Sequence, residues 1–212
     1  MSGENIGAKE SALIHAAILG DIGAVEGALG SEDVNASDAD GWTALHIASR
    51  NRNSEIARLL LSQPTIDVNV KNKWKSTPLM IAAGSGSLNV VELLLKHPRI
   101  QVDLCAQYYG RTALIEAAFN GHLSIAKALV AHGADVNATD KTGRNSALVE
   151  AIKNGHVNVA IFLLRSGLVD FSNDDVRLQA LIWAGSRGGD VLRAELDAAI
   201  SNFFRSNHRA VS

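Results

Sequence analysis

The stretch from Tyr109 to Asn137 reads YGRTALIEAAFNGHLSIAKALVAHGADVN and decides the fold of this chain. Gly110 suits a turn with positive φ, and Thr112 follows it as a helix N-cap whose hydroxyl can accept from free helical amides. A first helix with a narrow apolar stripe should end at Gly121, and a second helix with a broader apolar face should follow it. The stretch therefore predicts two short helices between two loops.

A leucine followed three residues later by an alanine recurs along almost the whole chain. We call these leucines the signature leucines, and they are Leu13, Leu45, Leu79, Leu114, Leu148 and Leu181. A period of 32 to 35 residues indicates a solenoid, because each small unit can bury its apolar face only against its neighbours. We expect six stacked units.

The blocks TALHIA at 43–48 and TPLMIA at 77–82 resemble the T-P-L-H-x-A signature of ankyrin repeats, and AHGADVN at 131–137 resembles their closing segment. The resemblance implies an all-α ankyrin repeat solenoid of helix-turn-helix units joined by β-hairpin-like loops. It implies one domain over 8–205, between an N-terminal extension at 1–7 and a disordered tail at 206–212. The expected units are 8–37 as the N-terminal cap, 38–71, 72–106, 107–139, 140–172 and 173–205 as the C-terminal cap.

Several positions depart from the repeat. Lys75 replaces the hairpin glycine of the third unit, and Arg52 replaces the glycine that ends the first helix of the second unit. The fifth unit carries one inserted residue at 142–148, which predicts a small bulge. We expect the terminal units to present polar outer faces, because an exposed core would aggregate. Apolar residues at helical spacing between Leu192 and Phe203 predict a closing amphipathic helix.

Composition indicates a globular chain without a strong overall charge. The net charge is -2, and 47% of the 212 residues are hydrophobic. The first 40 residues are acidic with Lys9 as their only base, whereas residues 41–80 are mainly basic. Cys105 is the only cysteine, which excludes an intramolecular disulfide and any zinc site with two thiolates. We expect no secretion signal and no membrane span, and a cytoplasmic location with the nucleus as the alternative.

No constellation of residues predicts catalysis, a metal site or a cofactor. His46, His122 and His156 stand where the ankyrin family itself favours histidine, so we interpret them as structural. Glu116 and Glu150 occupy equivalent positions of adjacent units and could be imagined as a catalytic pair, but no base or nucleophile accompanies them. We interpret both as exposed positions on first helices. The sequence therefore predicts no enzyme, no cofactor and no metal.

The resemblance also implies where a partner would bind. Ankyrin repeats commonly bind through their hairpin tips and the ends of their first helices, which line a concave groove. Carried over by position, this implies the candidate partner-binding residues Asp40, Trp42, Arg50, Asn51, Lys73, Trp74, Ser76, Tyr108, Tyr109, Arg111, Phe119, Asn120, Lys141, Arg144 and Lys153. Exposed Trp, Tyr and Arg side chains are enriched at binding hot spots. Each ring could instead pack on the next hairpin.

The leading hypothesis is a monomeric, non-catalytic adaptor, scaffold or regulator that binds a protein segment in this groove. The segment would be extended or helical and rich in acidic and apolar residues, because the candidate residues mix aromatic rings with cations. The alternative is nucleic-acid binding through the same basic and aromatic surface. The acidic first unit and the short basic cluster speak against it. The sequence leaves open whether binding inhibits, recruits or stabilises the partner.

Overall fold

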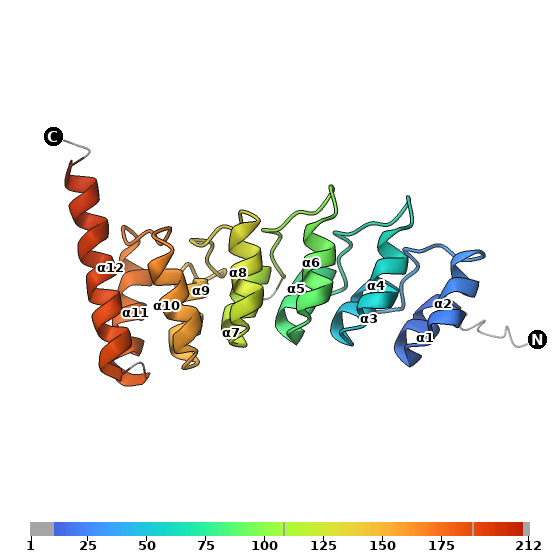
Figure 1. The fold of residues 1–212 in the computed structure, drawn as a ribbon, viewed down its shortest axis with the longest axis horizontal. Coiled ribbons are helices and arrows are strands. Elements are labelled where there is room, and N and C mark those ends of the chain that lie inside the picture. Colours follow the sequence, from blue (N-terminus) through green and yellow to red (C-terminus); the bar gives the residue numbers. More distant parts are fainter. Residues whose placement is uncertain (1–10, 108, 188, 210–212) are drawn as a thin grey trace, which may run out of the picture.

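Helix pairs follow one another along an elongated row in the computed structural model (Figure 1). The structure describes residues 11–107, 109–187 and 189–209. In these ranges it forms twelve helices, namely α1 (Ala12–Leu19), α2 (Ile22–Leu29), α3 (Ala44–Arg50), α4 (Ser54–Leu61), α5 (Pro78–Ser85), α6 (Leu88–Leu95), α7 (Ala113–Phe119), α8 (Leu123–Ala131), α9 (Ala147–Lys153), α10 (Val157–Arg165), α11 (Asp174–Arg187) and α12 (Gly189–Arg209). The all-α repeat solenoid is confirmed.

The first helices of units one to five start as their sequences predict. A hydroxyl side chain at each N-cap accepts a hydrogen bond from the amide three residues later, and the capping residues are Ser11, Thr43, Thr77, Thr112 and Ser146. Pro78 occupies the first position of α5, where a missing amide hydrogen leaves no bond unmade. Isolated bridges join Ser37 to Thr43 and Thr139 to Ser146, which closes two of the hairpin loops.

The turns between first and second helices use left-handed backbone. Gly86 and Gly121 have φ of 77° and 75°, and a Cβ on either glycine would collide with the histidine ring of the next unit. Arg52 takes the same conformation with φ of 59°, and Lys75 does so in its hairpin with φ of 60°. These two non-glycine residues therefore hold strained backbone. Gly188, the expected counterpart in the last unit, lies outside the described residues.

Two layers of helices bury the core. The first helices stack on one another in the order α1, α3, α5, α7, α9 and α11, and the second helices form a parallel layer behind them. The signature leucines of units one to five are fully buried, as the repeat requires. Side chains in the loops after the second helices also connect neighbouring units. The side-chain amide of Asn69 donates a hydrogen bond to the Arg99 carbonyl and accepts one from the backbone amide of Gln101.

Equivalent bonds are made by Asn35 and by Asn137, so this ladder of side-chain-to-backbone bonds connects successive loops. Asn137 therefore has a structural role, because it bonds to the backbone of the following loop. In the third unit the position is Asp103, which accepts from the Asp135 amide but has no amide hydrogens to donate. The ladder is therefore weaker at this step.

The C-terminal unit differs from expectation in two ways. α12 is confirmed as a closing helix, with Leu192 and Leu196 buried, but it continues to Arg209 and so extends past the expected limit of residue 205. The expected disorder of 206–209 is wrong in this respect, and 210–212, like the extension at 1–7, lies outside the described residues. The outer face of α11 also exposes Leu178 and Ile182, which contradicts the polar outer face predicted for a cap.

Candidate partner-binding groove

A groove crosses the first helices of units two to four. It encloses about 380 Å³ and takes its lining from α3, α5, α7 and the hairpin loops between them. The lining residues are Trp42, Arg50, Ser76, Met80, Ile81, Gly84, Ser85, Ala106, Glu116, Phe119 and Asn120. Its character is mixed, because aromatic and aliphatic surface lies beside one exposed cation and one carboxyl group. Such a surface fits a peptide side chain better than it fits a small, fully enclosed ligand.

The aromatic end of the groove is a cluster of Trp42, Arg50 and Trp74. The Trp42 and Trp74 rings meet edge to face with their centroids 6.3 Å apart, and the guanidinium of Arg50 lies 4.8 Å from the Trp42 ring centroid. Trp42 is half-buried, whereas Trp74 keeps 38% of its surface exposed. The Trp42 ring thus packs on the next hairpin, and both rings still present apolar surface to solvent.

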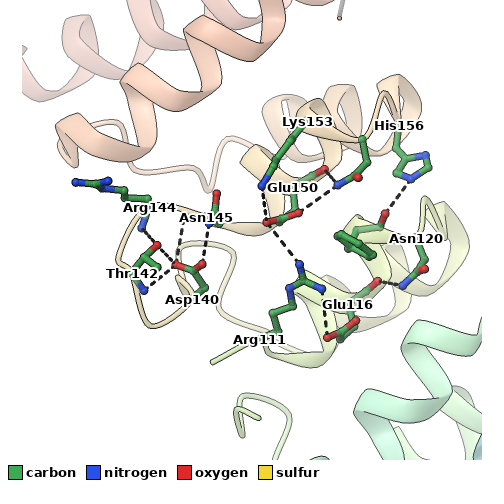
Figure 2. Close-up of polar contacts among 12 residues, drawn as sticks. Arg111, Glu116, Asn120, Asp140, Thr142, Arg144, Asn145, Glu150, Lys153 and His156 are labelled. Carbon is green, nitrogen blue, oxygen red and sulfur yellow. Dashed lines mark hydrogen bonds and ion pairs between the residues drawn. The ribbon is translucent and has the colours of Figure 1, made fainter. Parts of the chain in front are cut away.

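The charged end is organised by Arg111, which reaches between units four and five (Figure 2). Its guanidinium lies 4.1 Å from the Phe119 ring centroid and 5.3 Å from that of Tyr109. It also lies 3.8 Å from carboxylate oxygens of both Glu116 and Glu150. The guanidinium of Arg111 therefore contacts two aromatic rings and two carboxylates. Its planar, weakly hydrated head group suits both kinds of contact.

Glu116 and Glu150 are not the exposed residues that the sequence suggested. Glu150 is 2% exposed, and its carboxylate is balanced by Arg111 and by Lys153, whose Nζ lies 3.8 Å away. Burial raises the pKa of Glu116 above its ordinary value, and the nearby Glu150 adds to the rise while Arg111 opposes it. The prediction failed because the next unit covers both positions. Glu116 and Glu150 therefore serve to hold Arg111 between units four and five.

The hairpin of the fifth unit lies beyond this network. Asp140 accepts hydrogen bonds from Thr142 and Asn145, and although burial alone would raise its pKa, these bonds hold the pKa below the ordinary range (Figure 2). The hairpin spans one residue more than that of the second unit, which confirms the predicted insertion. The fourth unit has the same longer span from Ala106 to Arg111, which the sequence analysis missed. Ala106 stands there in place of Asp38 and Asp140, so its side chain cannot accept the amide hydrogen bonds that those aspartates accept.

The structure brings some candidate residues together and separates others. Those that line the groove are Trp42, Arg50, Ser76, Phe119 and Asn120. Those outside its lining are Asp40, Asn51, Lys73, Trp74, Tyr109, Arg111, Lys141, Arg144 and Lys153. Tyr108 lies outside the described residues. Met80, Ile81 and Glu116 line the groove but were not predicted, although the position two residues after each signature leucine would have pointed to the last two.

Several predicted cations are already paired with acids. Lys73 contacts Asp40 at 3.1 Å, and Arg144 approaches Asp175 at 4.0 Å, in addition to the pairs of Arg111 and Lys153. Among the ion pairs that the described residues form, none involves Arg50. Arg50 is therefore the cation of the groove that remains available for a partner's carboxylate.

The histidines serve as structural connectors, as predicted. The Nε2 atoms of His122 and His156 lie 3.2 and 2.9 Å from carbonyl oxygens of Gly84 and Phe119 in the preceding units. His46 bonds to its own N-cap and to the Ser76 carbonyl of the following unit, and burial lowers its pKa. In the described part of the chain, no three His, Cys, Asp or Glu residues lie close enough to hold a metal ion.

The repeat geometry agrees with comparisons to known families. A family model described as ankyrin repeats (3 copies) matches residues 2–72 and 65–140, and one described as ankyrin repeats (many copies) matches 121–164. The chain belongs to the ankyrin repeat family. Ankyrin repeats generally serve as protein–protein interaction modules and are generally non-catalytic. No curated protein matches this ankyrin repeat chain. Within the described ranges, none of its helices has the length and apolar character needed to cross a membrane.

Proposed function

We propose that this ankyrin repeat chain is a non-catalytic adaptor, scaffold or regulator that binds a segment of another protein in the groove across units two to four. The observation that carries the proposal is that Trp42, Ile81 and Phe119 line the same groove together with Arg50. Aromatic and arginine side chains grouped around a partly desolvated pocket are the usual composition of a binding hot spot. We expect it to act in the cytoplasm or the nucleus.

The chemistry of the groove selects the partner segment. A large apolar side chain would fill the space between the Trp42 and Phe119 rings. An acidic residue next to it would meet Arg50, the cation in the groove lining, which forms none of the ion pairs found among the described residues. We therefore propose an extended or helical segment that carries an apolar anchor beside a carboxylate.

Nucleic acid is the weaker candidate. Phosphate binding needs cations that are free to replace counterions, but Lys73 and Arg111 each lie beside a carboxylate in the structure. Binding to a single-stranded oligonucleotide that falls steeply with added salt would contradict this preference for a protein partner.

The proposal can be tested by crosslinking at defined positions. A photoreactive amino acid at Asn120, in the groove lining, should capture a partner that the same probe at exposed Asn158, on a second helix, does not. The captured protein, once purified, should bind the wild-type chain directly. Trp42→Ala with Trp74→Ala should then weaken binding at least about 30-fold, the loss expected for a hot spot worth about 2 kcal/mol.

Two further variants separate the groove from general effects. Arg50→Glu should weaken binding by reversing the charge offered to the partner's carboxylate, while its exposed side chain leaves the fold intact. Phe204→Ala removes an exposed ring from α12, far along the chain from the groove, and should leave affinity unchanged. Equal binding by wild type and the double tryptophan variant would show that the groove is not the binding site.

A further inference from the structure

Gly84 interrupts a series of larger side chains at the ends of the first helices. It stands five residues after the signature leucine of the third unit. The residues at this position in the other units are Ile18, Arg50, Phe119, Lys153 and Ser186. The helices α3 and α7, which pack on either side of α5, thus present Arg50 and Phe119, whereas α5 presents only a hydrogen atom. All three residues line the groove of about 380 Å³, so the missing side chain helps to form it.

The fold does not require glycine at this position. Gly84 lies inside α5 with helical backbone, unlike Gly86 and Gly121, which adopt the left-handed region. A Cβ at Gly84 would come no closer than 3.7 Å to the side chains around it, which is ordinary van der Waals contact. Glycine inside a helix is less stable than alanine because it loses more chain entropy. Gly84 thus lowers stability without a backbone or packing reason, and what it provides is open space in the groove.

The residues around this space define what fits into it. Trp42 and Phe119 give the groove lining its aromatic surface, and the Oε2 atom of Glu116 lies 3.7 Å from where a Cβ of Gly84 would be. The Oε1 atom lies 3.8 Å from Nη1 of Arg111, beyond hydrogen-bond distance, and no described residue donates a hydrogen bond to this carboxylate (Figure 2). Aromatic rings attract one another, and an acceptor that a partner covers needs a donor. A ring that carries one N–H or O–H group meets both requirements.

We propose that the space over Gly84 is a subsite for one aromatic anchor of the partner segment, a tyrosine or tryptophan whose O–H or N–H donates to Glu116. Gly84 then determines specificity, because any side chain at this position would occupy the subsite. The inference rests on the proposed function and names the anchor that the groove takes. It also separates two properties, since filling the subsite should strengthen the fold while it weakens binding.

Substitutions at Gly84 test this separation. The probes are phage-displayed random peptides about 12 residues long, which can cross three first helices in an extended conformation. Peptides are selected on the wild-type chain and kept if their binding requires Trp42 and Trp74. Gly84→Leu should weaken their binding at least about 30-fold, and Gly84→Ala about threefold to tenfold, because the smaller side chain fills less of the subsite.

Urea unfolding shows whether these losses come from a damaged fold. Both Gly84 variants should unfold at a higher urea concentration than the wild type, because alanine and leucine favour a helix more than glycine does. Gly27→Leu is the matched control. Gly27 lies inside α2, where a Cβ would meet open space, so this variant should also unfold at higher urea but should bind the peptides like the wild type.

Paired changes in the peptide and in the groove test the hydrogen bond. The anchor of a selected peptide is replaced by a ring without a donor, phenylalanine for tyrosine or naphthylalanine for tryptophan. Binding to the wild type should weaken about tenfold, because Glu116 is then covered without a donor. Binding to Glu116→Met should change by less than about twofold, since methionine removes the carboxylate acceptor.

The outcomes distinguish this subsite from the groove as a whole. Peptides that require Trp42 and Trp74 but bind Gly84→Leu as tightly as the wild type, or that contain neither tyrosine nor tryptophan, would overturn the subsite and leave the proposed function standing. An equal loss on the wild type and on Glu116→Met would overturn the hydrogen bond to Glu116. If no selected peptide requires the two tryptophans, the proposed function fails as well.

Discussion

Replacing Arg111 by methionine tests the charge network at the centre of the chain. Methionine keeps an unbranched apolar side chain but removes the guanidinium that lies over the Tyr109 and Phe119 rings. Glu150, which is almost fully buried, then retains Lys153 as its cationic neighbour, and Glu116 retains none among the ion pairs of the described residues. The variant should therefore fold less stably while its backbone architecture stays the same.

The expected loss follows from the burial of the acids. Removing one partner of a buried ion pair costs about 3–5 kcal/mol. The remaining contact of Glu150 with Lys153 and the partial exposure of Glu116 place this case at the lower end, about 3 kcal/mol, with about 1 kcal/mol of it from the lost cation–π contacts. Urea unfolding followed by circular dichroism near neutral pH measures this difference in the free energy of unfolding.

A second substitution checks that the loss arises from the acid and not from packing. Glu150→Gln removes the buried charge, so the double variant should recover about 2 kcal/mol relative to Arg111→Met alone. Arg144→Met is the matched control, because Arg144 also approaches an acid but is exposed, and it should cost less than about 0.5 kcal/mol.

The pH dependence supplies an independent check. Burial already raises the pKa of Glu116, and removal of Arg111 takes away the contribution that lowers it. The folded variant then binds a proton more tightly than the unfolded chain, so its deficit should grow as pH rises above about 4.5, the ordinary value, and shrink on acidification. A deficit that is small, insensitive to Glu150→Gln and constant with pH would refute the reasoning.

Four other substitutions test the contributions of single residues to stability. Arg52→Gly and Lys75→Gly should each stabilise the fold by about 0.5–1 kcal/mol in urea unfolding, because relief of left-handed strain exceeds the added chain entropy, whereas alanine at either position should give no gain. Asp103→Asn should add about 0.5–1 kcal/mol by restoring the donor that Asn69 uses in the loop ladder, and an unchanged midpoint would contradict this. Because burial lowers the pKa of His46 below 6.5, acidification through about pH 6.5 should destabilise the wild type more than His46→Met, and parallel pH curves would show that His46 does not contribute.

The sequence predicted what is determined within one unit. Thr112 caps α7 and Gly121 ends the following turn because both depend on backbone geometry a few residues away. The period then placed the first helices of units one to five, each of which starts one residue before its signature leucine. Burial of Glu150 could not be predicted in this way, because it depends on Arg111 of the preceding unit and on the cover that α11 provides. The groove lining was predicted only in part. Residues at the hairpin tips differ between units and were recognised in the sequence, whereas helix residues such as Met80 and Ile81 have the same apolar character as core residues.

The outer face of α11 was also predicted wrongly, although the sequence contained the information needed. The period predicted a last unit, and a general expectation about solenoids predicted a polar cap. Ile182 is as apolar as Ile14 and Ile115, which are buried at the same position of earlier units, so the sequence already contained the contrary signal. A comparison of equivalent positions in all six units would have shown, from the sequence alone, that the outer face of the last first helix is apolar.

The floor of the groove changes character along the row, and this gives it a direction. Two residues after the signature leucine, the third unit lines the groove with Ile81, whereas the fourth unit lines it with Glu116. Trp42 lies in the apolar part of this lining, and Arg111 lies 3.8 Å from Glu116 in the charged part. For the binding function proposed above, the apolar anchor of a partner therefore belongs over units two and three. The polar part of the segment would then run toward the fifth unit, so reversing the sequence of a bound peptide should abolish binding even though its composition is unchanged.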